Sequence, residues 1–262
     1  MGELWSARQL LRNLTVRELK VRYKRSAIGF LWSLVNPLLQ MAVFSLVFGK
    51  LFSASKTIPQ FPIFFIVAFL PWAFFQGSVQ NSTGAIVGNA NLVKKVYFPR
   101  EVLPVATMLA QFVHLLLAEL VLFVVLAIGG NDFLPYLPVF VIATVIVVVL
   151  ATGFAMLFAA LNTAFRDVQE LSGVLFLVWF YATPVVYPLS LVPSKWRWVL
   201  SLNPMTHVVR LYRYALYPVP RAGGFAWPPV TVVAAGAAFA VAALVLGYVV
   251  FGRMAANFAK EV

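Results

Sequence analysis

Long apolar runs separated by short polar segments dominate this chain of 262 residues. Six of them approach or exceed the ~20 residues with which an α-helix crosses the hydrocarbon core of a bilayer. They cover about residues 29–52, 61–79, 102–128, 135–161, 168–187 and 229–251. The pattern predicts an all-α polytopic membrane protein with six transmembrane helices, built as a single domain over residues 1–262. Residues 29–187 would hold the first five spans, and residues 229–251 the sixth.

The stretch before the first span mixes apolar and basic residues. Leu4, Ala7, Leu11 and Leu14 recur at helical spacing over residues 1–26, among seven basic residues and two acids. This spacing predicts an amphipathic helix that lies in the membrane interface. A solvated basic tail is the alternative, and the interleaved Leu and Trp side chains disfavour it.

The longest connection, residues 188–228, holds two short helical patterns separated by Asn203-Pro204. It is rich in Trp and Tyr, which gather at membrane interfaces. It also carries five basic residues and no acid. We expect short re-entrant helices here that dip part-way into the membrane, where protein covers their backbone.

Composition supports the membrane assignment. Hydrophobic residues make up 62% of the chain and charged residues 11%, and the mean hydropathy is +0.91, whereas a soluble domain is about a quarter charged. The net charge of +12 therefore favours contact with membrane lipid over nucleic acid. Six spans would place thirteen of the twenty basic residues on the side of both termini, which the positive-inside rule assigns to the cytoplasm.

Several enzyme signatures are absent from the sequence. It has no G-x-x-x-x-G-K-[ST] motif for ATP, no H-E-x-x-H motif, no G-x-S-x-G motif and no cysteine. Its two histidines, His114 and His207, lie in different regions. We therefore assign no catalytic residue, no metal site and no cofactor to this chain.

Polar residues inside the predicted spans have two interpretations each. For Glu119 we favour a protonated acid that is hydrogen-bonded to a neighbouring helix over a polar contact on a substrate path. For His114 we favour a packed core histidine, and the five-residue spacing turns it about 140° away from Glu119. Asn36-Pro37 bends the first span, either for packing or to shape a path. The aromatic residues around Trp72 and Trp179 are either ordinary membrane aromatics, which we favour for most of them, or the lining of a path for a glycan.

Four segments carry a resemblance to a known family. They are RYKRSAIGFLWSLVNPLLQ (Arg22–Gln40), NANLVKKVYFPREVLP (Asn89–Pro104), NTAFRDVQEL (Asn162–Leu171) and NPMTHVVRLYR (Asn203–Arg213). Together, in this order, they resemble the ABC-2 type permeases that export O-antigen, teichoic acid and capsular polysaccharide, over essentially the whole chain. The resemblance implies a homodimer of six-span subunits in the bacterial cytoplasmic membrane. It also implies two copies of a separate ATPase, which would bind ATP and Mg²⁺.

The resemblance assigns roles to particular residues. The cytoplasmic loop after the second span, otherwise a plain positive-inside loop, would hold the coupling helix that docks on the ATPase, with candidates Asn89, Asn91, Leu92, Lys94, Lys95 and Tyr97. The outer segment would gate the extracellular end, with candidates Trp196, Arg197, His207, Arg210 and Arg213. Two copies of the first and fifth spans would line a path between subunits, with candidates Trp32, Asn36, Gln40, Phe176, Trp179 and Tyr181. The Phe165-Arg166-Asp167 turn would contact the ATPase or form a structural ion pair.

The implied substrate is a polymer linked to polyprenyl diphosphate. Arg22, Lys24 and Arg25, at the start of the first span, are candidates to bind the diphosphate at the entrance. The five basic residues of the outer segment favour a phosphate-rich teichoic acid, with a neutral O-antigen-type glycan close behind. Drug or small-lipid exporters of the same fold, a membrane glycan transferase and a secondary transporter are the other classes that the sequence leaves open.

Overall fold

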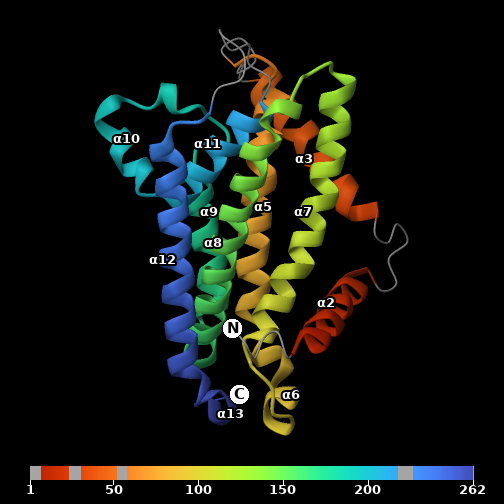
Figure 1. The fold of residues 1–262 in the computed structure, drawn as a ribbon, viewed down its shortest axis with the longest axis vertical. Helices are drawn as coiled ribbons and strands as arrows, with labels where there is room; N and C mark the ends of the chain where they lie inside the picture. Colours follow the sequence, from red (N-terminus) through yellow and green to blue (C-terminus); the bar gives the residue numbers. More distant parts are fainter. Residues whose placement is uncertain (1–6, 24–30, 52–57, 218–226, 262) are drawn as a thin grey trace.

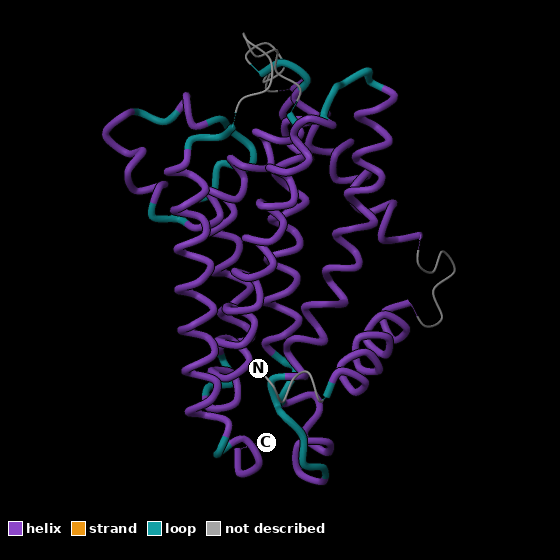
Figure 2. Tube along the Cα trace, viewed as in Figure 1, coloured by secondary structure: helices purple, strands orange, loops and turns teal. Residues whose placement is uncertain are grey.

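The computed structural model describes residues 7–23, 31–51, 58–217 and 227–261. Every element among these residues is a helix, and no strand is drawn in this part of the chain (Figure 2). In the described part of the chain, four helices are long and apolar enough to cross a membrane. They are α5 (Phe61–Thr83), α7 (Val102–Ile128), α8 (Leu137–Ala164) and α12 (Val230–Ala255). The expectation of an all-helical, multi-pass membrane fold is confirmed.

Helix α5 lies at the centre of the bundle, against α7, α8 and α11 (Pro204–Leu216). Its aromatic side chains other than the half-buried Phe69 are almost fully buried and meet rings from several helices. The Phe75 ring packs edge-on against Phe154 of α8, with 5.4 Å between centroids, and Trp72 packs edge-on against Phe176 of α9 (Val168–Ala182) at 6.2 Å. Edge-to-face packing suits rings whose faces are negative and edges positive, so it holds these helices in register.

Helices α8 and α12 cross at two glycines. A Cβ atom added to Gly247 would lie 2.1 Å from the carbonyl oxygen of Gly153, and one added to Gly153 would lie 2.4 Å from the backbone of Ala243. Small residues allow helix backbones in a membrane to approach this closely, and van der Waals contact then stabilises the pair. Of all helix pairs in the described chain, α8 and α12 make the most extensive contact.

The first and fifth predicted spans form shorter helices than expected. The first consists of α3 (Trp32–Phe44), which continues through Asn36-Pro37, and a π-helical segment, η2 (Ser45–Leu51). Helix α9 has 15 residues and is therefore about 22 Å long, short of the ~30 Å hydrocarbon core. It ends at Ala182 because Pro184 forces Thr183 into an extended conformation, with φ −101° and ψ 135°.

The two ends of the bundle differ in structure (Figure 1). At one end, α10 (Ser194–Ser201) and α11 form a re-entrant hairpin beside η5 (Leu189–Leu191) and near η4 (Leu134–Tyr136). At the other end lie α2 (Arg8–Tyr23), η3 (Val87–Asn89), α6 (Ala90–Lys95) and α13 (Phe258–Glu261). A second apolar core, which includes Leu14, Ile86, Val93 and Phe258, joins the elements of this end.

Candidate functional site

The turn of the re-entrant hairpin is fixed to the end of α9 by one side chain, Asn203. Its Oδ1 accepts hydrogen bonds from Nε1 of Trp179, at 2.9 Å, and from the backbone N–H of Met205, at 3.0 Å. Its Nδ2 donates to the carbonyl of Ala182, at 3.1 Å, and to Oγ1 of Thr183, at 2.8 Å. Asn203 thus caps α11 and satisfies the backbone where α9 stops. The predicted division of the segment at Asn203-Pro204 is confirmed.

Arg213, a predicted gate residue, is largely buried among backbone carbonyls. Its guanidinium donates to the carbonyls of Pro184 and Val185, both at 2.6 Å, and more weakly to those of Tyr187 and Phe64, both at 3.4 Å. It also lies 3.5 Å from the centroid of the Phe64 ring. A planar guanidinium with a fixed set of donors suits this arrangement better than a lysine ammonium does. Arg213 therefore joins α11 to α5 and to the residues after α9, and most of its donors are bonded within the chain.

Glu119 is tied to the re-entrant helix. The Tyr212 hydroxyl lies 2.8 Å from Oε1 of Glu119 and 2.9 Å from Oγ1 of Thr144, and so links α11 to α7 and α8. Glu119 and Tyr212 are 1% and 0% exposed. The favoured interpretation of Glu119, hydrogen bonding to a neighbouring helix, is confirmed. Among the described residues no cation pairs with this carboxyl, and burial of an ionised carboxylate without such a partner is costly.

The other gate candidates divide into buried and exposed residues. His207 is buried, its Nε2 lies 2.8 Å from the carbonyl of Ser201, and its Nδ1 has no partner in the described part of the chain. Because a carbonyl only accepts, Nε2 of His207 carries a proton here. Trp196, Arg197 and Arg210 are exposed, and Arg197 donates to the carbonyl of Val192 at 2.9 Å.

The predicted coupling segment forms a short helix at the opposite end. Helix α6 (Ala90–Lys95) ends before the candidate Tyr97, and Val96 between them is extended. Asn91, Lys94 and Lys95 are exposed, Leu92 is half-buried, and Tyr97 is fully exposed at 103%. An aromatic side chain in complete contact with solvent is available to a partner protein.

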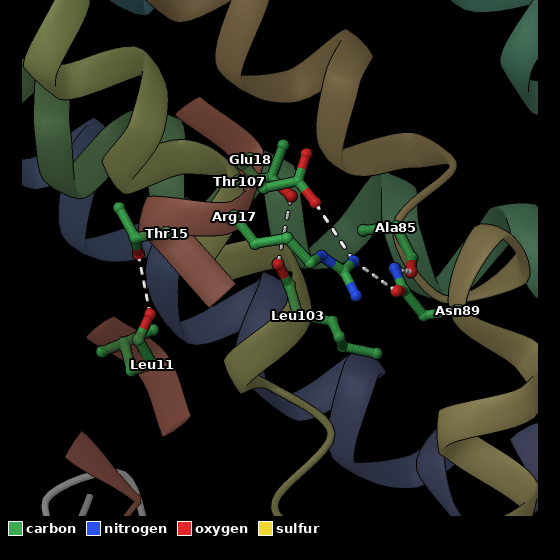
Figure 3. A network of polar contacts seen from close by, with 8 residues as sticks. All are labelled: Leu11, Thr15, Arg17, Glu18, Ala85, Asn89, Leu103 and Thr107. Carbon is green, nitrogen blue, oxygen red and sulfur yellow. Dashed lines mark hydrogen bonds and ion pairs between the residues drawn. The ribbon is translucent and has the colours of Figure 1, made fainter. Parts of the chain in front are cut away.

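Asn89, also a coupling candidate, uses its side chain inside the molecule. Its Oδ1 accepts a hydrogen bond of 2.6 Å from Arg17 of α2, and its Nδ2 donates to the carbonyl of Ala85 at 2.8 Å. Arg17 also pairs with Glu18 at 3.3 Å, the one ion pair in the described ranges (Figure 3). Asn89 therefore connects the amphipathic helix to the start of α6.

The entrance and path candidates are only partly described. Lys24 and Arg25 lie outside the described residues, and so does the side chain of Arg22. On α3, Trp32, Asn36 and Gln40 are all exposed at four-residue spacing, which places them on one face. Tyr181 is exposed and Trp179 half-buried. Phe176 is 0% exposed, so it does not line a path in this structure but anchors α9 in the core.

Sequence reasoning missed three residues that the structure makes central: Arg17, Tyr212 and Gly153. No local pattern singles them out, because their contacts are distant in sequence. Tyr212 bonds to Glu119, 93 residues away, and Arg17 bonds to Asn89, 72 residues away. The Phe165-Arg166-Asp167 turn is exposed, and within the described ranges it forms no ion pair.

Comparison with known proteins identifies the family. The ABC-2 type transporter family model matches residues 9–217. The O-antigen export system permease protein RfbA of Myxococcus xanthus is 36% identical over 217 residues, which cover 82% of this chain and 83% of that protein. A protein of the same name from Klebsiella pneumoniae is 32% identical over 208 residues, 78% of each chain. The polysialic acid transport protein KpsM of Escherichia coli is 23% identical over 210 residues, 78% of this chain and 80% of that one. This chain belongs to the ABC-2 type transporter family.

Proposed function

We propose that this chain is the membrane subunit of an ATP-driven exporter that moves a polyprenyl-diphosphate-linked cell-surface polysaccharide across the bacterial cytoplasmic membrane. The observation that carries the proposal is the 36% identity, over 82% of the chain, to a protein named as an O-antigen export permease. The multi-pass helical fold supports it, because transport through the membrane needs spanning helices rather than a catalytic centre. The subunit itself performs no covalent chemistry in this proposal.

ATP hydrolysis belongs to a separate subunit, present in two copies with bound Mg²⁺. The support is the absence of a P-loop from the sequence and the exposed surface of α6. Asn91, Lys94, Lys95 and Tyr97 present polar, basic and aromatic groups at one end of the bundle, where a cytoplasmic partner reaches them. Helices α2 and α13, the first and last helices of the described chain, lie at this same end, which we assign to the cytoplasm (Figure 1).

A homodimer completes the transport path. Helix α9 buries only Ser172 and Phe176 in this chain, whereas Leu171, Val174, Leu177 and Val178 are more than 60% exposed. On α3, Leu38, Leu39 and Val43 are exposed as well. We assign these apolar faces to contact with a second copy, with the polar Asn36 and Gln40 beside the path. Arg22, Lys24 and Arg25 remain our candidates for the diphosphate at its entrance.

The class of polymer has two candidates. The relatives named above favour a polysaccharide of O-antigen or capsular type. Five basic residues without an acid in the outer segment favour a phosphate-rich teichoic acid. The basic residues argue less strongly for teichoic acid than their number suggests, because Arg213 and Arg197 already donate hydrogen bonds to backbone carbonyls. We therefore place polysaccharide first.

The test is ATPase stimulation of the chain in nanodiscs, co-expressed with its nucleotide-binding partner. One arm adds undecaprenyl-diphosphate-linked neutral glycan, and the other adds the same carrier with a poly(glycerol phosphate) chain. We expect selective stimulation by the neutral glycan. Selective stimulation by the phosphate polymer would move the assignment to teichoic acid. A chain that binds no ATPase and responds to neither substrate would overturn the exporter proposal.

A further inference from the structure

A polar pocket lies between α2, α5 and α7, apart from every residue that the proposed function uses. Its volume is about 240 Å³, and its polar lining comes from Glu18, Asn81, Thr107, Gln111 and His114. On α7 these residues extend from about 8 to 18 Å beyond the start of the helix, counted at 1.5 Å per residue. The pocket is open to the surface, because Asn81 and Val21 in its lining are exposed, and it lies on the side of α2. Polar groups within a membrane span are costly and usually mark a functional site.

Much of the hydrogen-bonding capacity of this lining is unused. The Gln111 amide has no hydrogen bond to any described residue, and its Oε1 lies over Gly77, where an added Cβ would be 3.3 Å away. Asn81 donates to the carbonyl of Gly77 at 2.6 Å, which leaves its own Oδ1 as an acceptor. The Thr107 hydroxyl donates to the carbonyl of Leu103, at 3.2 Å, and retains its lone pairs (Figure 3). Two side-chain amides, a hydroxyl and a carboxylate thus face one space.

The charges of the residues that line the pocket determine which class of ligand it can bind. Glu18 repels a phosphate, and no Lys or Arg lines the pocket. Glu18 is also already paired with Arg17, so the pocket offers little to a cation. Amides, hydroxyls and a carboxylate match the alternating donors and acceptors of a sugar, whose vicinal hydroxyls form paired hydrogen bonds.

A second pocket on α2 supplies the complementary charge. It has a volume of about 520 Å³ and is lined by Asn13, Val16, Arg17, Lys20 and Val21. Val21 lines both pockets. A basic pocket and a polar pocket without Lys or Arg therefore adjoin at one end of the amphipathic helix, and an anionic phosphate next to an uncharged sugar matches this arrangement.

We propose that the pocket between α2, α5 and α7 binds the first sugar of a phosphate-linked glycolipid, through Glu18, Asn81 and Gln111. The proposal rests on the proposed function and adds a sugar subsite to it. The adjoining pocket, with Arg17 and Lys20, holds the phosphate before it reaches Arg22, Lys24 and Arg25, the entrance candidates of the proposed function. The amphipathic helix then reads the head group of the lipid before transport begins.

Native mass spectrometry of the chain in complex with its ATPase tests the subsite. The two probes are undecaprenyl diphosphate and the same lipid carrying one N-acetylglucosamine. We expect Gln111→Leu and Glu18→Gln each to lower the affinity for the sugar-bearing lipid, relative to that for the sugar-free lipid, about fivefold, the equivalent of one hydrogen bond. Lys20→Gln is expected to weaken both. Gln80→Leu, on α5 outside the pocket, is the matched control and should change neither.

The outcomes separate the subsite from the proposed function. If both pocket variants bind the two lipids as the unmodified chain does, or lose affinity for both equally, the sugar subsite is wrong. Because Glu18 and Gln111 lie on different helices, a folding defect in one variant leaves the other to decide. If the unmodified complex binds neither lipid, the proposed function itself fails.

Discussion

The glycine crossing of α8 and α12 gives a sharp prediction for Gly247→Ala. The added Cβ would lie 2.1 Å from the Gly153 carbonyl oxygen and 2.9 Å from its carbonyl carbon. Both are backbone atoms, so no side chain can turn aside. The two helices must separate by about 1 Å to restore ordinary contact, in the most extensive helix pair of the bundle. Overpacking of this kind costs about 1–3 kcal/mol of folding free energy.

Thermal unfolding of the purified protein, followed by intrinsic tryptophan fluorescence, measures this loss. Gly252→Ala is the matched control, because it lies on the same helix and its Cβ would meet nothing within 4 Å. Gly236→Ala should fall between the two, since its nearest contacts would be ordinary ones of 3.4–3.6 Å. We expect the apparent Tm to be highest for Gly252→Ala, intermediate for Gly236→Ala and lowest for Gly247→Ala. If Gly247→Ala unfolds at the same temperature as Gly252→Ala, the close crossing does not exist as described.

Three further changes test the remaining contacts. Arg213→Lys loses the paired hydrogen bonds to backbone carbonyls and should lower the free energy of unfolding by about 2 kcal/mol, which is measured as a reduced Tm. An unchanged Tm would mean that the geometry of the guanidinium is unimportant. Tyr212→Phe leaves the buried Glu119 carboxyl without its hydrogen-bond donor and should lower the free energy of unfolding by about 1–3 kcal/mol. Glu119→Gln keeps an acceptor for the Tyr212 hydroxyl and should lower it less. The reverse order in thermal unfolding would contradict a protonated Glu119. Asn89→Ala should reduce ATP-driven export per ATP hydrolysed without lowering Tm, because it removes the hydrogen bond between Arg17 of α2 and the residue that precedes α6. Equal ratios in Asn89→Ala and the unmodified chain would show that the contact transmits nothing.

The sequence by itself determined the elements that depend on local pattern. Four apolar runs became long helices because an isolated backbone in lipid must satisfy its hydrogen bonds within the segment. The amphipathic helix and the helix pair at Asn203-Pro204 followed from helical spacing and from proline's fixed φ. The four ordered motifs also carried the family, which the match over residues 9–217 confirmed.

Only the tertiary structure decided which polar groups are in use and where short helices stop. Asn89 and Arg213 are of residue types that often bind partners or ligands, yet here they form hydrogen bonds within the chain itself. Gln111 looks like an ordinary residue of a span, yet it faces an open pocket. The physical reason is that hydrogen-bond satisfaction depends on neighbours that are distant in sequence, whereas helix formation in a membrane depends on the segment alone.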